Sequence, residues 1–156
     1  MIIANNIEKS FGPQSLFEGV SFLMNEGERV GLVGKNGTGK STLFKMILGQ
    51  ESPDSGTLTT PNGYRIGTLE QIICFTQPTV LEECIKVLSP DKQWDHYKAE
   101  IILSGLGFSE QDFLKDPATF SGGYQVRINL CKALLANPNM LLLDEPTNYL
   151  DILSLR

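Results

Sequence analysis

The sequence predicts an α/β domain in which a phosphate-binding loop joins a strand to a helix. Three observations predict it: the glycine-rich stretch GKNGTGKST at 34–42, the apolar run ending in an acidic pair in LLLDE at 141–145, and the order of elements. That order is strand, loop, helix, helical insert, helix, strand. At 156 residues the chain has the size of one domain and is long enough to bury a core.

The N-terminal elements follow from turn signals and apolar spacing. Residues 2–11 and 16–24 are expected to form two strands joined by a Gly12-Pro13 turn. Residues 28–33, ERVGLV, are expected to form a short strand that runs into the glycine-rich loop. The spacing of Leu43, Met46 and Ile47 then predicts a helix over 38–48 with one apolar face.

The middle of the chain is predicted to be mainly helical. SPDSG at 52–56 breaks the chain, and residues 64–69 are expected to form another strand. Residues 79–88 and 92–104 carry helical patterns without strong strand signals between them. We therefore expect a small helical subdomain here.

A further helix and a strand complete the predicted order. The helix begins after SGG at 121–123 and is expected to stop near Asn137, because Pro138 follows. The strand is MLLL at 140–143, and it ends in the acidic pair. The predicted apolar face of the helix consists of Val126, Leu130, Ala133 and Leu134.

Composition is that of a soluble globular protein, with 41% hydrophobic and 20% charged residues. A net charge of −5 provides no general attraction for nucleic acid or anionic membranes. No apolar run approaches the ~20 residues that span a bilayer, and MIIANNIEKSFG lacks the features of a signal peptide. We expect a cytoplasmic protein without direct membrane insertion. Cys74, Cys84 and Cys131 contain no CxxC pair, which favours buried reduced thiols over a disulfide or a zinc site.

The stretch at 34–42 matches the phosphate-binding pattern G-x-x-x-x-G-K-[ST], with a predicted strand before it and a helix after it. Glycines let backbone N–H groups surround phosphates, and the helix start adds its positive end. Lys40 is predicted to contact the β- and γ-phosphates, and the Ser41 hydroxyl to bind Mg²⁺. A plain glycine turn would not call for that lysine and hydroxyl. The predicted ATP-binding residues of this stretch are Gly34, Asn36, Gly37, Gly39, Lys40, Ser41 and Thr42.

The acidic pair is predicted to emerge at the C-terminal end of a central strand, where open α/β sheets bind ligands. Asp144 is expected to hold Mg²⁺ largely through water, and Glu145 to polarise the attacking water as general base. Taken alone, such a pair is equally typical of a solvated strand end. The phosphate-binding loop favours the catalytic interpretation.

Two further stretches carry a resemblance to a known family. FSGGYQVR at 120–127 resembles the signature motif of ATP-binding cassette (ABC) ATPases, and DEPTNYLD at 144–151 resembles their Walker B and D-loop run. The resemblance covers the chain from Met1, with the motifs in the expected order. It implies a P-loop NTPase core of the ABC cassette type, α/β in class, with an N-terminal antiparallel β part and a helical subdomain.

The same resemblance implies domain boundaries within a partial cassette at 1–156. The β part and phosphate-binding loop would occupy approximately residues 1–70. The helical subdomain and signature helix would occupy 72–136, and the Walker B and D-loop residues 139–156. The C-terminal part of a cassette would be absent.

The resemblance also implies site residues beyond the two motifs. Phe11 would stack on adenine, although a core position is an open alternative, and Gln71 would contact Mg²⁺ and the attacking water. Two cassettes would sandwich two ATP molecules, so that Ser121, Gly122 and Gly123 contact ATP bound to the opposite cassette. Asp151 is the D-loop aspartate. The implied catalytic residues are Glu145 and Gln71, and the implied Mg²⁺ ligands are Ser41, Gln71 and Asp144.

Within the family, Tyr124, Arg127 and the D-loop NYLD at 148–151 resemble the ABC-F class of soluble tandem ATPases. That class typically reads NHLD, so Tyr149 is a departure. ABC-F proteins act on the ribosome, in translation or in resistance to ribosome-targeting antibiotics, so the ribosome is an implied partner. Two alternatives stay open: the ATP-binding subunit of a membrane transporter, docked on a permease, and a non-catalytic nucleotide-binding fragment.

Two departures bear on the whole protein. The stretch from Gln71 to Ser121 has the length of a plain cassette, so the helical arm of many ABC-F proteins is missing or minimal. The chain also ends at Arg156, before the family's switch histidine, and His96 is expected to be a surface residue that cannot replace it. We expect this to be the N-terminal part of a longer protein, and residues 1–156 alone to be inactive as an ATPase.

Overall fold

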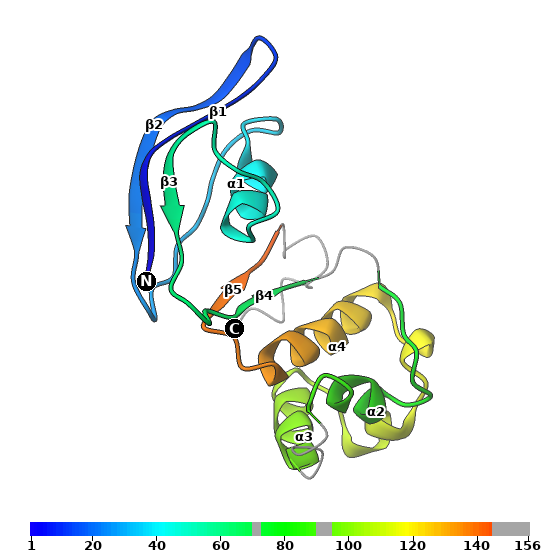
Figure 1. Cartoon of the computed structure of the whole chain (residues 1–156). Helices are drawn as coiled ribbons and strands as arrows, with labels where there is room; N and C mark the ends of the chain where they lie inside the picture. Colours follow the sequence, from blue (N-terminus) through cyan, green and yellow to red (C-terminus); the bar gives the residue numbers. More distant parts are fainter. Residues whose placement is uncertain (70–72, 90–94, 145–156) are drawn as a thin grey trace. The chain divides into compact units, whose positions relative to one another are not determined.

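The computed structural model describes residues 1–69, 73–89 and 95–144. The chain divides into two compact units, Met1–Tyr64 and Arg65–Arg156, which are treated separately below (Figure 1). Three of the predicted site residues, Gln71, Glu145 and Asp151, lie outside the described residues.

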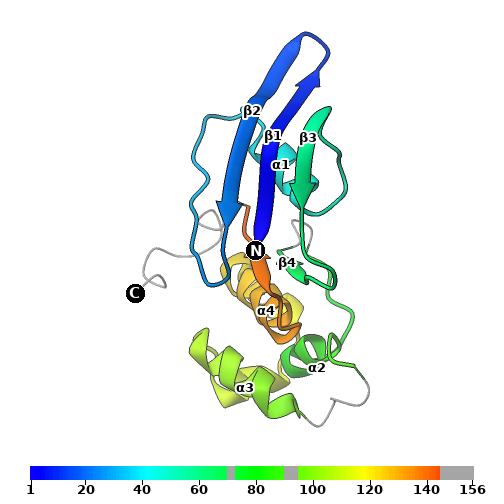
Figure 2. The ribbon, with the colours of Figure 1, turned by 60° about the vertical axis from the view of Figure 1, so that its left-hand side comes forward.

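The first unit is built on an antiparallel sheet of β1 (Ile2–Phe11), β2 (Gln14–Met24) and β3 (Ser55–Thr59), in the order β2-β1-β3 (Figure 2). Phe11 pairs with Gln14 across the two-residue turn, which confirms the predicted hairpin. β3 was not predicted, because SPDSG contains only turn signals. The strand is held by its pairing with β1, in which Ile3 lies opposite Thr59.

Helix α1 (Lys40–Ile47) follows the glycine-rich loop and packs on one face of this sheet (Figure 1). Met46 is buried against Ala4 and Ile7 of β1. Regular alternation would place residues three apart on opposite faces, but β1 has a register shift between Ala4 and Ile7, with Asn6 at φ 45°, and both side chains reach the helix. The predicted helix at 38–48 is therefore confirmed, and it begins two residues later than expected.

The strand predicted at 28–33 is wrong. These residues have no regular secondary structure, and no other described residue pairs with them in a ladder. Val30 and Val33 are 61% and 94% exposed. An apolar, β-branched run favours an extended chain, but a strand also needs a neighbour to accept its hydrogen bonds.

The second unit contains the helical part of the chain and a pair of short parallel strands (Figure 1). Ile66 lies opposite Met140 and Thr68 opposite Leu142 in the strand pair. The predicted helical subdomain is confirmed. The elements are β4 (Ile66–Thr68), α2 (Val80–Ile85), α3 (His96–Gly105), η2 (Glu110–Leu114), η3 (Pro117–Thr119), α4 (Gly122–Leu135) and β5 (Met140–Leu142).

Helices α2, α3 and α4 enclose one apolar core. Its buried members are Val80, Cys84, Ala99, Leu103, Phe108, Phe113, Ile128, Cys131 and Leu135. The apolar face predicted for α4 is only partly correct: Val126 is buried, but Leu134 is 39% exposed. Apolar residues occur around most of this helix, so the sequence pattern does not define a single apolar face. Packing against α2 and α3 determines which side is buried.

The C-terminal end of α4 agrees with the prediction. The helix stops at Leu135, and Asn137 adopts the left-handed conformation with φ 48°. Its N–H donates to the carbonyl oxygen of Leu134, and Pro138 prevents any continuation.

The cysteine prediction is wrong for one of the three residues. Cys84 and Cys131 are buried free thiols, whereas Cys74 is exposed. Cys74 lies in the connection between β4 and α2. His96, at the start of α3, is exposed as expected.

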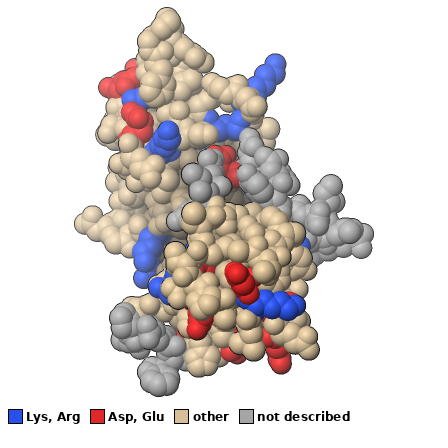
Figure 3. Space-filling model, turned by 90° about the vertical axis from the view of Figure 1, so that its right-hand side faces the viewer, with Lys and Arg blue, Asp and Glu red and all other residues tan. Residues whose placement is uncertain are grey.

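Charge is mixed over the visible surface. On the face drawn in Figure 3, basic and acidic side chains lie among one another and form no large patch of one sign. Among the described helices, none is both long and apolar enough to cross a bilayer.

Candidate nucleotide-binding site

The phosphate-binding loop depends on glycine geometry. Gly37 and Gly39 have φ values of 82° and 92°, a conformation that other residues adopt at a cost. Gly39 is also buried, and a Cβ atom there would lie 2.9 Å from Cζ of Phe17. Glycine at position 39 is therefore required both by the backbone and by the close approach of β2.

The loop delivers the chain into α1 with an uncapped N-terminus. Gly39 is the N-cap residue, no described side chain caps the helix, and its first turn contains no acidic residue. The N–H groups and the positive end of the helix dipole thus make this helix start suitable for binding an anion. Ser41 is exposed and Thr42 is half-buried in this first turn, with hydroxyls of the type that bind Mg²⁺ and phosphate.

Lys40 lies across the loop that precedes it. Its Nζ donates to the carbonyl oxygens of Gly34, at 2.9 Å, and Lys35, at 3.0 Å. The Thr38 hydroxyl donates to the same Lys35 carbonyl at 2.8 Å. These contacts place the lysine charge beside a cavity of about 270 Å³, which is lined by Phe17, Leu32, Val33, Gly34, Thr38, Lys40 and Leu43.

Phe11 ends β1 in the same unit and is not a core residue. The residue is 52% exposed, which excludes the alternative that it fills the core. Gln14, its partner in the hairpin, donates from Nε2 to the carbonyl oxygen of Gly37 at 3.5 Å. The aromatic ring and the phosphate-binding loop are thus parts of one packed unit. Asn36, a residue of this loop, is exposed.

The acidic strand end lies in the second unit. Asp144 follows β5 by two residues and is half-buried. Because β4 and β5 are parallel, the residues that follow Thr68 and Leu142 leave the sheet at the same edge. Joint action of Asp144 with Gln71 and Glu145, and of this edge with the phosphate-binding loop, stays a prediction.

The signature residues begin α4. Ser121 is the N-cap residue with φ −60° and ψ 156°, and Gly122 and Gly123 form the first helical positions. Ser121 and Gly122 are exposed. Gln125 holds the preceding loop, because its Nε2 donates to the carbonyl oxygen of Phe120 at 2.9 Å. The helix start is therefore presented at the surface in a defined conformation.

An aromatic cluster that sequence reasoning missed supports this helix start. The ring of Tyr124 lies 5.1 Å from that of Phe108 and 5.8 Å from that of Phe120. The guanidinium of Arg127 lies 4.6 Å from the centre of the Tyr124 ring, and its Nη1 donates to the Leu106 carbonyl. Tyr124 and Arg127, two separate residues in the family resemblance, thus contact each other in the structure. The available signal was the pair of aromatic residues, Phe120 and Tyr124, on either side of the SGG stretch.

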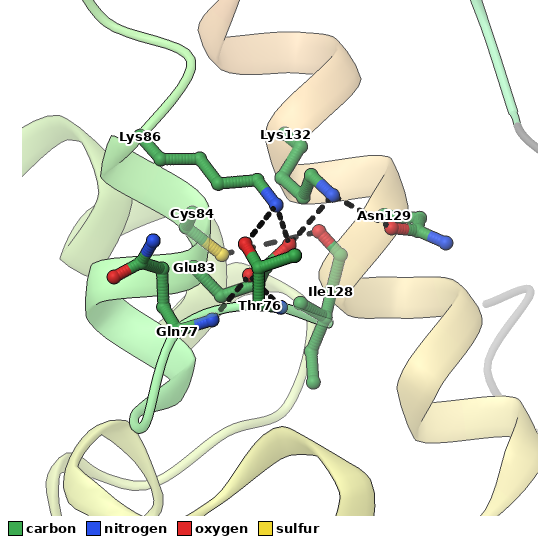
Figure 4. A network of polar contacts seen from close by, with 8 residues as sticks. All are labelled: Thr76, Gln77, Glu83, Cys84, Lys86, Ile128, Asn129 and Lys132. Atoms are coloured by element: carbon green, nitrogen blue, oxygen red, sulfur yellow. Dashed lines mark hydrogen bonds and ion pairs between the residues drawn. The ribbon is translucent and has the colours of Figure 1, made fainter. Parts of the chain in front are cut away.

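A second missed feature is the buried carboxylate of Glu83 in α2, shown in Figure 4. It accepts from Nζ of Lys132 in α4 at 2.8 Å and pairs with Lys86. It also accepts from the backbone N–H groups of Thr76 and Gln77. One side chain thus ties the segment 73–79 to the helix that carries the signature residues.

Burial by itself raises the pKa of Glu83. The hydrogen bonds from Lys132 and Lys86 and from the two backbone N–H groups outweigh this effect and lower the pKa to about 2. Glu83 is therefore ionised at neutral pH. Nothing in the local sequence distinguishes it from exposed Glu82 beside it.

Comparison with known proteins agrees with these motifs. The family described as "ABC transporter" matches residues 17–148. Energy-dependent translational throttle protein EttA of Escherichia coli (strain K12) is 40% identical over 155 residues, which are 97% of this chain and 28% of that protein. Probable ATP-binding protein YheS of the same strain is 30% identical in an alignment of 185 positions, which covers 97% of this chain and 29% of that protein. The chain thus spans less than a third of these relatives' length.

A solved structure gives the same assignment. It is the dimeric structure of a post-hydrolysis state of the ATP-binding cassette MJ0796 bound to ADP and Pi, with a TM-score of 0.76 and 25% identity. The match covers 99% of this chain and 78% of that one. The predicted P-loop NTPase fold is thereby confirmed, and this chain belongs to the ABC transporter family as an ATP-binding cassette of the P-loop NTPase fold.

Proposed function

We propose that this chain is the first ATP-binding cassette of an ABC-F-type ATPase that acts on the ribosome in the cytoplasm. The observation that carries the ATP site is the loop from Gly34 to Lys40, with its left-handed glycines and uncapped helix. Support for the ribosome comes from the similarity to a translational throttle protein. Tyr124, Arg127 and the D-loop NYLD support the ABC-F class.

In the proposed site, each residue has one task. Lys40 moves from the loop carbonyls to the β- and γ-phosphates, and the N–H groups of the loop and α1 hold the remaining phosphate oxygens. Phe11 stacks on adenine. Ser41, Asp144 and Gln71 would hold Mg²⁺, and its charge would neutralise the phosphate oxygens. Glu145 accepts a proton from the attacking water.

Hydrolysis in this proposal needs a second cassette, in the same longer chain or in a second copy. Ser121, Gly122 and Gly123 present an exposed helix start that suits the γ-phosphate held by the opposite cassette. The neighbouring solved cassette is itself a dimer with ADP and Pi. The action is then a switch between a closed sandwich and an open pair.

The alternative function is that of the ATP-binding subunit of a membrane transporter. It is favoured by the solved neighbours, which include a bacterial ABC transporter cassette with a TM-score of 0.75 and 25% identity. In that case the helical subdomain would dock on a permease.

The role of Lys40 is tested by Lys40→Ala in the intact protein. Loss of its charge-assisted phosphate contacts, worth about 1.5–3 kcal/mol, should weaken ATP binding ~10-fold or more. Calorimetric titration with Mg²⁺-ATP measures this. Lys115→Ala is the matched control, because Lys115 is an exposed lysine whose partner is Asp112 in the helical subdomain. An unchanged affinity in Lys40→Ala would exclude the assigned role.

The functional class is tested by sedimentation. The intact protein carrying Glu145→Gln should hold ATP in the closed sandwich, because the base is lost while binding is kept. It should pellet with ribosomes when ATP is present and stay in the supernatant without it. Co-purification with membranes through a permease, with no ribosome binding, would instead select the transporter function.

A further inference from the structure

Lys9 of β1 is a lysine with almost no exposed surface. Only 8% of the residue is accessible, although lysines are rarely buried unless they are paired. Its Nζ donates to Glu51 Oε1 at 2.8 Å, to the Ser52 carbonyl oxygen at 2.8 Å and to Asp54 Oδ1 at 3.0 Å. All three donor positions of the ammonium are used.

These bonds join the end of β1 to the segment that connects α1 with β3. Asp54 accepts from the backbone N–H of Ser10 at 2.8 Å through its second oxygen. The backbone N–H of Asp54 donates to the Glu8 carbonyl oxygen, also at 2.8 Å. The residues on both sides of Lys9 are thus held, and Ser10 directly precedes Phe11.

The same ammonium lies over the ring of Phe11. Lys9 Nζ is 5.3 Å from the ring centre, within the range of a cation–π attraction. The hydrogen bond to Glu51 has the largest effect on the pKa of Lys9, followed by the bond to Asp54, and both raise it. Lys9 is therefore a cation at neutral pH. Since half of Phe11 is still exposed, the ring keeps surface on which a planar base can stack.

We propose that Lys9 is a positioning residue for Phe11, which strengthens binding of the nucleotide base without contributing to phosphate binding. The cation holds the ring in one orientation and draws its electron density, and both effects favour stacking on an electron-rich purine. The proposal rests on the proposed function, in which Phe11 contacts adenine.

The experiment separates base binding from phosphate binding with two probes, Mg²⁺-ATP and Mg²⁺-tripolyphosphate, titrated into the intact protein. Lys9→Met keeps the apolar stem and removes the charge. Lys9→Gln also retains a hydrogen-bond donor for Glu51 and Asp54, and it replaces Lys9→Met if the latter does not fold. Lys98→Met is the matched control, because Lys98 pairs with Asp95 at 2.6 Å and lies 5.8 Å from the Tyr97 ring centre, away from the phosphate-binding loop in the chain.

Each neutral Lys9 variant should weaken ATP binding about 3- to 10-fold and change tripolyphosphate binding by less than about 2-fold. Lys9→Arg should restore ATP binding. In a Phe11→Ala background the Lys9 substitution should have no further effect on ATP, because the ring it orients is gone. Lys98→Met should match the parent for both probes.

Two results would overturn the proposal. Equal losses for ATP and tripolyphosphate would mean that Lys9 only stabilises the unit, and an unchanged ATP affinity would mean that it does not act on Phe11. Failure of the proposed function looks different: ATP binding would then be insensitive to Lys40→Ala, or Phe11→Ala would bind ATP as the parent does.

Discussion

Replacing Glu145 by glutamine is expected to lower the ATP hydrolysis rate of the intact protein by about 10²–10⁴ while ATP still binds. Glutamine has nearly the shape of glutamate but cannot accept the proton of the attacking water. The residue is assigned from its position after the apolar strand and Asp144, and from the family resemblance.

The measurement is a steady-state phosphate-release assay together with an ATP-binding titration. Glu110→Gln serves as the control, because Glu110 is an exposed glutamate of η2 in the helical subdomain. This substitution should leave both the hydrolysis rate and the ATP affinity unchanged. A Glu145→Gln protein that turns over at the parental rate would show that the general base is another residue.

Replacing Glu83 by glutamine is expected to destabilise the second unit by about 3 kcal/mol, because it leaves the ammonium groups of Lys132 and Lys86 without their buried counter-charge. The loss of unfolding free energy in that unit is measured by urea unfolding, monitored by the hydrogen exchange of the amides in α2 and α4. Glu82→Gln is the matched control: the adjacent glutamate is exposed and accepts from the Thr79 hydroxyl, so its loss should cost less than about 1 kcal/mol.

The same carboxylate makes stability depend on acid. Its pKa is lowered from an ordinary 4.5 to about 2 in the folded chain, so its stabilisation is complete above pH 4.5 and disappears as the pH falls toward 2. A shift of this size corresponds to roughly 3 kcal/mol. Glu83→Gln should remove this part of the pH dependence between pH 4.5 and 2. Parental acid sensitivity in the variant would contradict the assignment.

Local chemistry was sufficient to predict the glycine-rich loop and the helix after it, but not the strand expected before it. The pattern from Gly34 to Ser41 predicted the turn glycines of the loop and the helix start, because left-handed backbone conformation is a property of glycine itself. The β1–β2 hairpin and the end of α4 before Pro138 were likewise predictable from Gly and Pro. The ABC cassette fold, too, could be predicted from sequence, because three motifs occurred in order.

Other features depend on contacts between distant residues, and only the tertiary structure decided them. β3 exists because β1 lies beside it, while residues 28–33 have no described pairing partner and form no strand. The buried side of α4 is set by the positions of α2 and α3.

Charged and aromatic residues show the same division. In the sequence, nothing distinguishes Lys9 and Glu83 from other charged residues. Phe11 could have been either a core residue or an exposed ring that stacks on adenine. Both residues, Lys9 and Glu83, are buried and bind partners 40 or more residues away in the chain. Lys9 bonds to Glu51 beside the exposed ring of Phe11, and Glu83 connects α2 to Lys132 of α4. Sequence alone determined the backbone of the loop at 34–39 and the start of α1, since glycine conformation is a local property. The tertiary structure decided which charges are buried, since desolvation and pairing depend on what folds around them.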